Sequence, residues 1–327
     1  MVARLGPGAY SWSPDSAHLL VSVYGKNSEV FDRAGKAAGT FGATVGWLDA
    51  GHLINEFGRV DSLAAPELSE PGDNSWVFAN GHGSAAIIVA VPGCDGDPQV
   101  VWYRDGSLGV ARETVKPFGW SVDGRLALLG HYSCDHPELA GWQGRVDVVD
   151  FATRQTLVGA GGVTGKMALN PAATRLAAQS GTNVKVVDVA DGPSMTIADA
   201  VFLGWRDSEH LYLKTGAKDE IRLVDVSGGR TQAGTAAGAW LIPSNAGPFV
   251  EADASGAVRR IVGSDGATTL LDLSGESLVA DSALTSAPDY ARNWAGPWSP
   301  DGRMLVLESH GGTALYLFSV DPAPPAA

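Results

Sequence analysis

The sequence is short of the features that mark several common classes of protein. No hydrophobic run approaches the roughly 20 residues of a membrane-spanning helix, the longest being Ala85 to Val91. Only 18% of the residues are charged, and acidic residues outnumber basic ones 36 to 23, which gives a net charge of −13. Because nucleic acids require a basic surface, we expect no nucleic-acid partner. Because no hydrophobic run is long enough, we also expect no insertion of this chain into a membrane.

Signatures of catalysis are also missing. The chain has no Gly-x-Ser-x-Gly nucleophile elbow, no His-Glu-x-x-His helix, no Gly-x-x-x-x-Gly-Lys phosphate loop and no glycine-rich dinucleotide motif. Asp95 and Asp97 are a pair of carboxylates that can act as general acid and general base. The Asp-Gly-Asp sequence at 95–97 also resembles the start of a calcium-binding loop, but the rest of that pattern is absent. The sequence therefore predicts no cofactor and no metal, and it favours a protein without catalysis.

What the chain has instead is a repeated phrase: a Trp, a turn of the Ser-Pro-Asp-Gly type, a hydrophobic strand, and a second strand that ends in Val-Asp. The clear copies begin at Trp12, Trp120 and Trp298, and the weaker ones at Trp47, Trp76, Met167, Trp205 and Trp240. The mean interval between these starts is about 41 residues, which is the length of one four-stranded propeller blade.

Each part of the phrase has a physical reading. Pro, Asp and Gly supply the backbone angles of a tight turn, and short β-prone runs such as Leu126 to Leu129 suit strands buried on both faces. The repeated Trp and Asp residues are predicted to be structural. The indoles fill the wedge between blades, and the carboxylates cap amides of the turns.

These repeats resemble those of TolB-type propellers, the bacterial relatives of WD-repeat proteins, over essentially the whole chain. The resemblance implies an all-β fold, a closed β-propeller of four-stranded blades. The repeat count predicts eight blades. Seven is the alternative, because the copies at Met167 and Trp240 lack the acidic turn.

The two ends of the chain predict how the ring closes. The last copy lacks an outer strand, and the segment Val2 to Leu5 has the right length to supply it and so to cover an exposed sheet edge. Residues 1–321 are then expected to form a single domain and a monomer. The Pro/Ala-rich tail 322–327 cannot continue a ladder.

The two cysteines bear on the cellular compartment. Cys94 and Cys134 each follow the second strand of a blade, in neighbouring blades, so their loops are expected to lie side by side and to permit a disulfide. A disulfide would indicate an extracytoplasmic protein whose leader or anchor lies outside this sequence, since no signal peptide follows Met1. Two alternatives stay open: free thiols in the cytoplasm, and a metal held with His131 and His136.

Long connections predict the binding side of the ring. The longest are 64–75, 92–97, 131–144 and 276–297, and all are assigned to one face. Acidic and aromatic residues there suit a small cationic or sugar-like ligand, although any soluble loop is rich in acids. The candidate ligand-binding residues on this face are His131, Asp135, His136, Glu138, Trp142, Asp289, Tyr290, Arg292 and Trp294.

A second candidate set lies where second strands end, at the mouth of a central funnel. Its members recur at similar offsets from the repeat starts: Glu56, His131, Gln179, Lys214, Glu251 and Glu308. The sequence as a whole favours a noncatalytic propeller that binds a protein or a small ligand through its long-loop face. The alternatives are a hydrolase or lyase with its site in the funnel, and a sensor module of a larger membrane-anchored protein.

Overall fold

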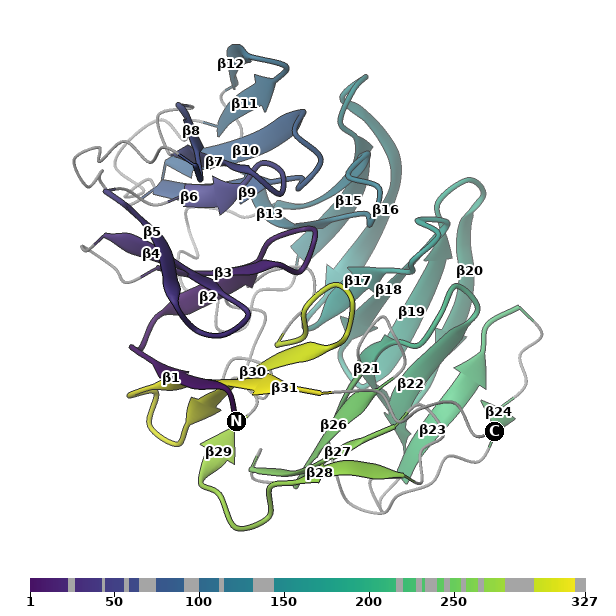
Figure 1. Ribbon diagram of the computed structural model, residues 1–327. Coiled ribbons are helices and arrows are strands. Elements are labelled where there is room, and N and C mark those ends of the chain that lie inside the picture. Colours follow the sequence, from purple (N-terminus) through teal and green to yellow (C-terminus); the bar gives the residue numbers. More distant parts are fainter. Residues whose placement is uncertain are drawn as a thin grey trace, which may run out of the picture.

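The computed structural model is an all-β ring. It describes residues 1–22, 27–42, 45–55, 59–64, 75–90, 100–111, 115–131, 144–215, 220–227, 231–232, 240–243, 248–253, 257–263, 268–279 and 297–320. In these ranges the chain forms 31 strands, which assemble into eight separate antiparallel sheets arranged around a centre (Figure 1). The described residues contain no helix long and apolar enough to cross a membrane. The eight blades predicted from the repeat count are therefore confirmed.

We number the blades in chain order from the first tryptophan. Blades 1 to 4 consist of β2 (Ala9–Trp12), β3 (His18–Ser22), β4 (Ser28–Asp32) and β5 (Ala37–Phe41); β6 (Val45–Trp47), β7 (His52–Asn55) and β8 (Val60–Ser62); β9 (Ser75–Ala79), β10 (Ala85–Ala90), β11 (Val100–Arg104) and β12 (Ser107–Ala111); and β13 (Val115–Trp120), β14 (Leu126–His131), β15 (Gly144–Asp150) and β16 (Gln155–Val163).

Blades 5 to 8 consist of β17 (Met167–Leu169), β18 (Arg175–Ser180), β19 (Asn183–Asp188) and β20 (Gly192–Ile197); β21 (Ala200–Trp205), β22 (His210–Thr215), β23 (Glu220–Asp225) and β24 (Thr231–Gln232); β25 (Trp240–Pro243), β26 (Phe249–Ala252), β27 (Val258–Val262) and β28 (Thr269–Asp272); and β29 (Leu278–Val279), β30 (Met304–Ser309), β31 (Leu315–Ser319) and β1 (Ala3–Leu5). At four junctions the first strands of neighbouring blades contact one another, namely β2 with β6, β6 with β9, β17 with β21 and β21 with β25, so the first strands line the inside of the ring.

Several blades depart from the repeat. Trp240 begins β25, Met167 begins β17 and Trp76 lies near the start of β9. Trp12 and Trp205 instead end their inner strands, so those three repeat starts are not equivalent to the others. In blade 8 the inner strand is in two pieces, because Leu278 and Trp298 both pair with β30 although 19 residues separate them (279–297).

The tryptophans hold neighbouring inner strands together. In blades 1, 2, 4 and 6 the indole Nε1 donates to a carbonyl of the preceding blade, one residue before that blade's inner strand ends. The four bonds run from Trp12 to Pro297, from Trp47 to Ser11, from Trp120 to Phe78 and from Trp205 to Ala168, over 2.9 to 3.3 Å. The structural role predicted for these indoles follows from a hydrogen bond as well as from packing.

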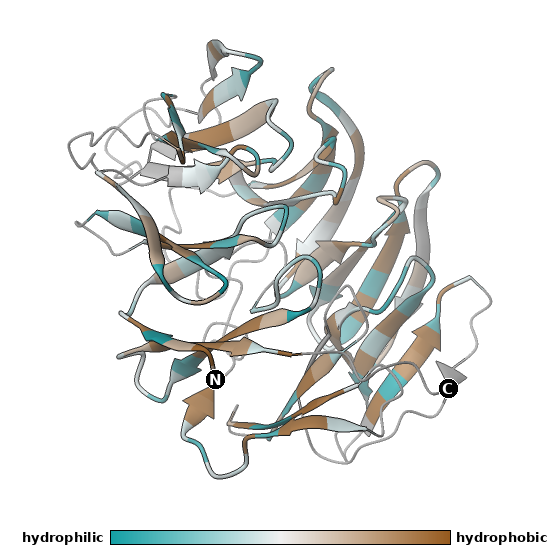
Figure 2. Cartoon of the chain, viewed as in Figure 1, coloured by the Kyte–Doolittle hydropathy of each residue, from teal (hydrophilic) through white to brown (hydrophobic). Residues whose placement is uncertain are grey.

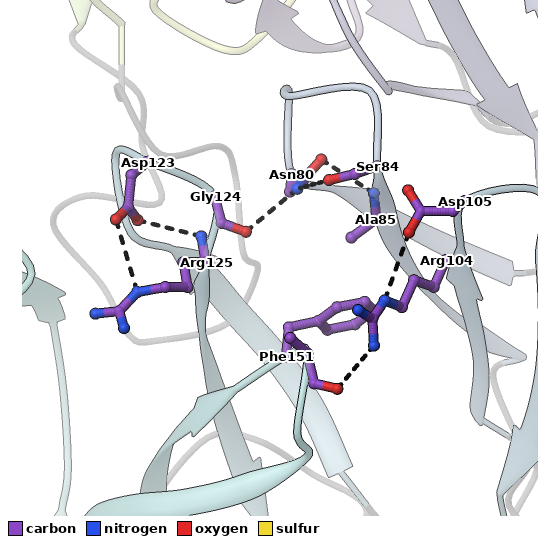
Figure 3. A pocket seen from close by; sticks show the side chains of 10 residues that line it. Asn80, Ser84, Ala85, Arg104, Asp105, Asp123, Gly124, Arg125 and Phe151 are labelled. Atoms are coloured by element: carbon purple, nitrogen blue, oxygen red, sulfur yellow. Dashed lines mark hydrogen bonds and ion pairs between the residues drawn. The ribbon is translucent and has the colours of Figure 1, made fainter.

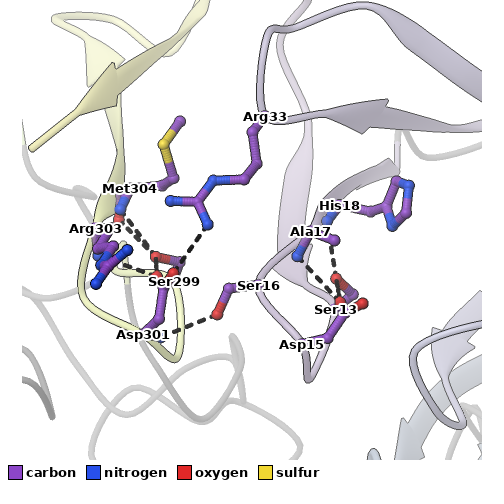
Figure 4. Close-up of polar contacts among 10 residues, drawn as sticks. All are labelled: Ser13, Asp15, Ser16, Ala17, His18, Arg33, Ser299, Asp301, Arg303 and Met304. Carbon is purple, nitrogen blue, oxygen red and sulfur yellow. Dashed lines mark hydrogen bonds and ion pairs between the residues drawn. The ribbon is translucent and has the colours of Figure 1, made fainter.

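Ring closure joins blade 8 to blade 1, as predicted. Strand β1 pairs antiparallel with β31, and Leu5 is buried among residues of both blades. In the turns, Asp301 accepts a 2.9 Å bond from the Arg33 guanidinium and its backbone N–H donates to Ser16 Oγ (Figure 4). The Asp301 carboxylate also accepts from Ser299 Oγ and from the Arg303 amide, which is the predicted capping role.

The core lies in the seams between blades rather than in one central cluster. Most of the clusters of buried side chains combine residues of two neighbouring blades, such as Trp120 of blade 4 with Ile87 and Trp102 of blade 3. Figure 2 accordingly shows hydrophobic residues running along the strands and hydrophilic ones at many turns.

The connections are uneven at the two ends of the ring. Turns from first to second and from third to fourth strands are short, from two residues (105–106) to six (263–268). Connections from second to third strands, or between blades, include the long stretches 63–74, 91–99 and 132–143. We call these two ends the short-turn face and the long-loop face. The fourth long segment, 280–296, interrupts the inner strand of blade 8 instead of joining two blades.

Candidate functional site

The structure describes five of the predicted candidate residues: His131, Gln179, Lys214, Glu251 and Glu308. The others lie outside the described residues and stay predictions, as do both cysteines of the expected disulfide. These are Glu56, Cys94, Cys134, Asp135, His136, Glu138, Trp142, Asp289, Tyr290, Arg292 and Trp294. In the described ranges no three His, Cys, Asp or Glu residues gather as metal ligands.

His131 belongs to a polar cluster at the long-loop end of blade 4. It ends β14, and its Nε2 lies 2.9 Å from Oδ2 of Asp147 on the neighbouring strand β15. Nε of Arg145 donates to the other oxygen, Oδ1, at 2.6 Å. The Asp147 side chain is only 7% exposed, while those of His131 and Arg145 are 47% and 62% exposed. A buried carboxylate therefore orients two exposed side chains beside the start of the 132–143 connection.

The local sequence makes room for this cluster. Val146 and Val148 point into the core, so the alternation of the strand places Arg145 and Asp147 together on the opposite face. Across the ladder, Asp147 pairs with Gly159, and a Cβ there would lie 2.5 Å from the carboxylate oxygen. A side chain at position 159 would therefore push the Asp147 carboxylate away from its two partners.

The other described candidates do not join this cluster. Glu251 of blade 7 pairs with Arg260 of the adjacent strand, at 2.8 to 2.9 Å from Oε2, and Arg260 also reaches Thr269 Oγ1. Glu308 is buried in blade 8, and Lys214 is half-buried in blade 6. The structure places them in separate blades around the ring.

Three members of the second candidate set do share one level. In blades 5, 6 and 8 the last residue of the inner strand pairs with a leucine of the second strand, namely Leu176, Leu211 and Leu305. Gln179, Lys214 and Glu308 each lie three residues after that leucine. The side-chain amide of Gln179 bonds to backbone groups. Its Nε2 donates to the carbonyls of Gly181, Asn183 and Ala200, and its Oε1 accepts from the Phe202 amide. Its bonds to Ala200 and Phe202 tie blade 5 to blade 6.

A small hollow of about 250 Å³ lies on the short-turn face between blades 3 and 4 (Figure 3). Its charged residues are largely engaged with the protein itself. Arg104 donates to the Ala152 carbonyl at 2.8 Å, and Arg125 lies 3.8 Å from Asp123. Partial burial opposes the charge of Asp123, but bonds from Ser121 Oγ and the Arg125 amide outweigh it and lower the pKa of that carboxyl. The hollow is therefore a gap between the turn at 80–84 of blade 3 and the turn at 121–125 of blade 4.

The neighbouring Gly81-His82-Gly83-Ser84 segment is a turn, in line with the sequence interpretation. It connects β9 to β10, and His82 Nε2 lies 2.7 Å from the Val122 carbonyl of blade 4. Among the described residues, the cluster of His131, Arg145 and Asp147 is the better placed for recognition, because it borders long connections. Sequence reasoning found His131 but missed Arg145 and Asp147. Their signal was a pair of charges alternating with buried valines.

Comparison with solved structures gives matches to 823 chains. One of them is the β-propeller domain of Cps50 (Swd1) from Myceliophteria thermophila, which is 8% identical in sequence with a TM-score of 0.46. The match covers 98% of this chain and 100% of that one. No protein-family model matches the sequence, and neither does any curated protein. This similarity concerns the fold alone.

Proposed function

We propose that this protein is a noncatalytic binding or scaffold propeller, of the TolB type and extracytoplasmic, that recognises its partner through the long-loop face. The observation that carries the proposal is the uneven length of the connections. Turns on the short-turn face stop at six residues (263–268), whereas 91–99 and 132–143 follow the second strands of adjacent blades. Length confined to one end of a rigid repeat array is typical of a recognition surface.

The cluster on blade 4 gives this face a fixed polar anchor. His131 and Arg145 are held by the buried Asp147 and reach solvent beside the 132–143 connection. A rigid donor pair is suited to the hydroxyl groups of a sugar-like ligand or to an acidic group of a protein. The net charge of −13 favours a cationic ligand elsewhere on the surface.

Binding can be tested by calorimetric titration of the native protein with chitotriose, a neutral sugar, and spermidine, a cation. We expect at least one of these probes to bind. His131→Ala should weaken sugar binding by about tenfold, the cost of one lost hydrogen bond to a fixed group. Lys36→Ala, an exposed change on the short-turn face, is the matched control and should change nothing. If neither probe binds the native protein, the small-ligand part of the proposal is wrong.

The proposed location outside the cytoplasm rests on the cysteines. The segments that contain Cys94 and Cys134 leave the second strands of blades 3 and 4, which are neighbours in the ring. We expect the unreduced, unfolded protein to resist a thiol alkylator and to have a mass two hydrogens below that of the reduced chain. Two alkylated thiols in the unreduced sample would show that the disulfide is absent.

A hydrolase or lyase is the second candidate, and one observation favours it. A buried carboxylate that orients an imidazole, as Asp147 does for His131, is the arrangement that prepares a histidine for general base catalysis. Hydrolysis of 4-nitrophenyl esters and glycosides by the native protein, and its loss in His131→Gln, would support this candidate over the binding role.

A further inference from the structure

Asp-Gly pairs are points at which a protein backbone can react with its own side chain. The structure describes four of them, at 105–106, 123–124, 191–192 and 301–302. Glycine has no Cβ to obstruct the approach of its nitrogen to the preceding carboxyl carbon. Whether the reaction occurs in the folded chain depends on what holds the glycine amide and the carboxyl group.

Hydrogen bonds hold both groups at two of these pairs. The amides of Gly124 and Gly302 each donate to the carbonyl of the serine three residues earlier, over 2.8 Å. The carboxylates of Asp123 and Asp301 each accept from the hydroxyl of that serine and from the arginine amide two residues later. Partial burial opposes the charge of both carboxyls, but these bonds outweigh it and lower their pKa. The uncharged carboxyl, which is the electrophile, is therefore scarcer at these two sites.

The pair at 191–192 is held by a strand ladder. Gly192 is the first residue of β20 and pairs with Asp188 of β19. The Asp191 amide donates to the Asp188 carboxylate at 3.3 Å. Attack by the Gly192 nitrogen would require the end of this ladder to open.

Asp105 and Gly106 have neither restraint. They form the two-residue turn between β11 and β12, with φ angles of 46° and 83°. The Asp105 side chain is 68% exposed and forms an ion pair with Nε of Arg104 at 3.5 Å (Figure 3). Among the described residues no backbone amide donates to this carboxylate, and the Gly106 amide donates to no carbonyl. A Cβ added at position 106 would meet no atom within 4 Å, so the glycine has room to move.

We propose that Asp105 is a modification site, at which the folded protein converts aspartate to isoaspartate without an enzyme. The Gly106 nitrogen attacks the uncharged carboxyl carbon, a C–N bond forms, and the carboxyl hydroxyl leaves with the amide proton as water. A second water then opens the cyclic imide at the former backbone carbonyl, so that the chain continues through the side chain. No oxidation or reduction is involved, and the mass is unchanged because one water is lost and one is gained.

The modification changes the outer hairpin of blade 3. Isoaspartate keeps the negative charge but adds one carbon to the backbone of a turn that spans two residues. Arg104 and Ser107 pair across that turn, so we expect the pairing of β11 with β12 to loosen at this end. The Asp105 carboxylate also borders the hollow between blades 3 and 4, which would change shape. All of these changes lie on the short-turn face, apart from the proposed recognition surface.

The test is incubation of the native protein in water enriched in oxygen-18 at mildly acidic pH, followed by digestion and peptide mass spectrometry. Ring opening places a heavy oxygen in the peptide, and electron-transfer fragmentation distinguishes isoaspartate from aspartate. We expect Asp105 to be labelled about tenfold faster than Asp123 and Asp301, because each of those sites must first break the hydrogen bond of its glycine amide. In urea, where no turn is held, the three sites should react at similar rates.

Asp105→Glu is the matched variant, because glutamate keeps the charge while its extra methylene removes the favourable ring size. It should lose the label in this peptide alone. Labelling of Asp105 no faster than that of the other two sites in the folded protein, or a label that persists in Asp105→Glu, would overturn the proposal. Circular dichroism during the incubation shows whether the labelled protein is folded. Neither outcome depends on ligand binding at the long-loop face, so this test and that of the proposed function fail separately.

Discussion

Removal of residues 1–5 is expected to lower the free energy of unfolding by about 4 kcal/mol and to make the protein self-associate. Strand β1 contributes three ladder pairs to β31, and Leu5, 8% exposed, packs against Trp12 and Leu317. Without it, β31 becomes an open sheet edge whose unpaired amides and carbonyls can pair with another chain. Urea denaturation gives the first effect, and light scattering against protein concentration gives the second.

The control for this deletion is removal of a similar length from the other end, residues 322–327, which should leave the unfolding free energy unchanged within about 0.5 kcal/mol. A synthetic peptide of residues 1–7 added to the shortened protein should restore part of the lost stability. An unfolding curve that coincides with that of the full chain would contradict the assignment of β1 as the strand that closes the ring.

Replacement of Trp298 by Ala should cost about 4 kcal/mol, at the large end of core truncations. Trp298 is 1% exposed and is among the largest fully buried side chains of the described residues. It packs with Val250 and Ile261 of blade 7 and with Leu305 and Phe318 of its own blade, so its loss empties a seam between two blades. The measurement is the free energy of unfolding in urea.

Two matched variants give this prediction its meaning. Trp298→Phe keeps most of the buried area and should cost clearly less than Trp298→Ala. Val122→Ala changes a side chain that is 57% exposed in a turn and should have almost no effect. A cost below about 1 kcal/mol for Trp298→Ala would mean that the seam between blades 7 and 8 is not packed as described.

The fold could be predicted because its signals are local and repeated. The turn residues around Asp15, Asp123 and Asp301 bond their own backbone or side-chain neighbours, so each can be recognised without knowledge of distant parts. The N-terminal strand was predicted by a different argument, from the missing strand of the last repeat. Trp76 and Trp240 misled the register, because a tryptophan near the start of an inner strand looks the same in sequence as one at the end.

The candidate site was harder to predict, because it depends on contacts across strands. His131 and Asp147 are 16 positions apart, and only the pairing of β14 with β15 brings them together. Lys166 gives no local signal at all, since its acceptor, the Leu203 carbonyl, and its aromatic neighbour, Phe202, belong to the next blade. Side chains that act between blades cannot be paired from spacing alone. The loop residues expected to contact a ligand remain predictions.

The closure of the ring by its first strand has a consequence for synthesis. Ala3 and Leu317 are partners in one sheet, yet the ribosome adds them 314 positions apart. At roughly 5 to 20 residues per second, the first strand waits about 15 to 60 s before its partner exists. Throughout that time blades 1 to 7 can form in order while both ends of the row remain open. The nascent protein therefore passes through an arc whose two terminal blades expose the hydrophobic faces that later pack against blade 8.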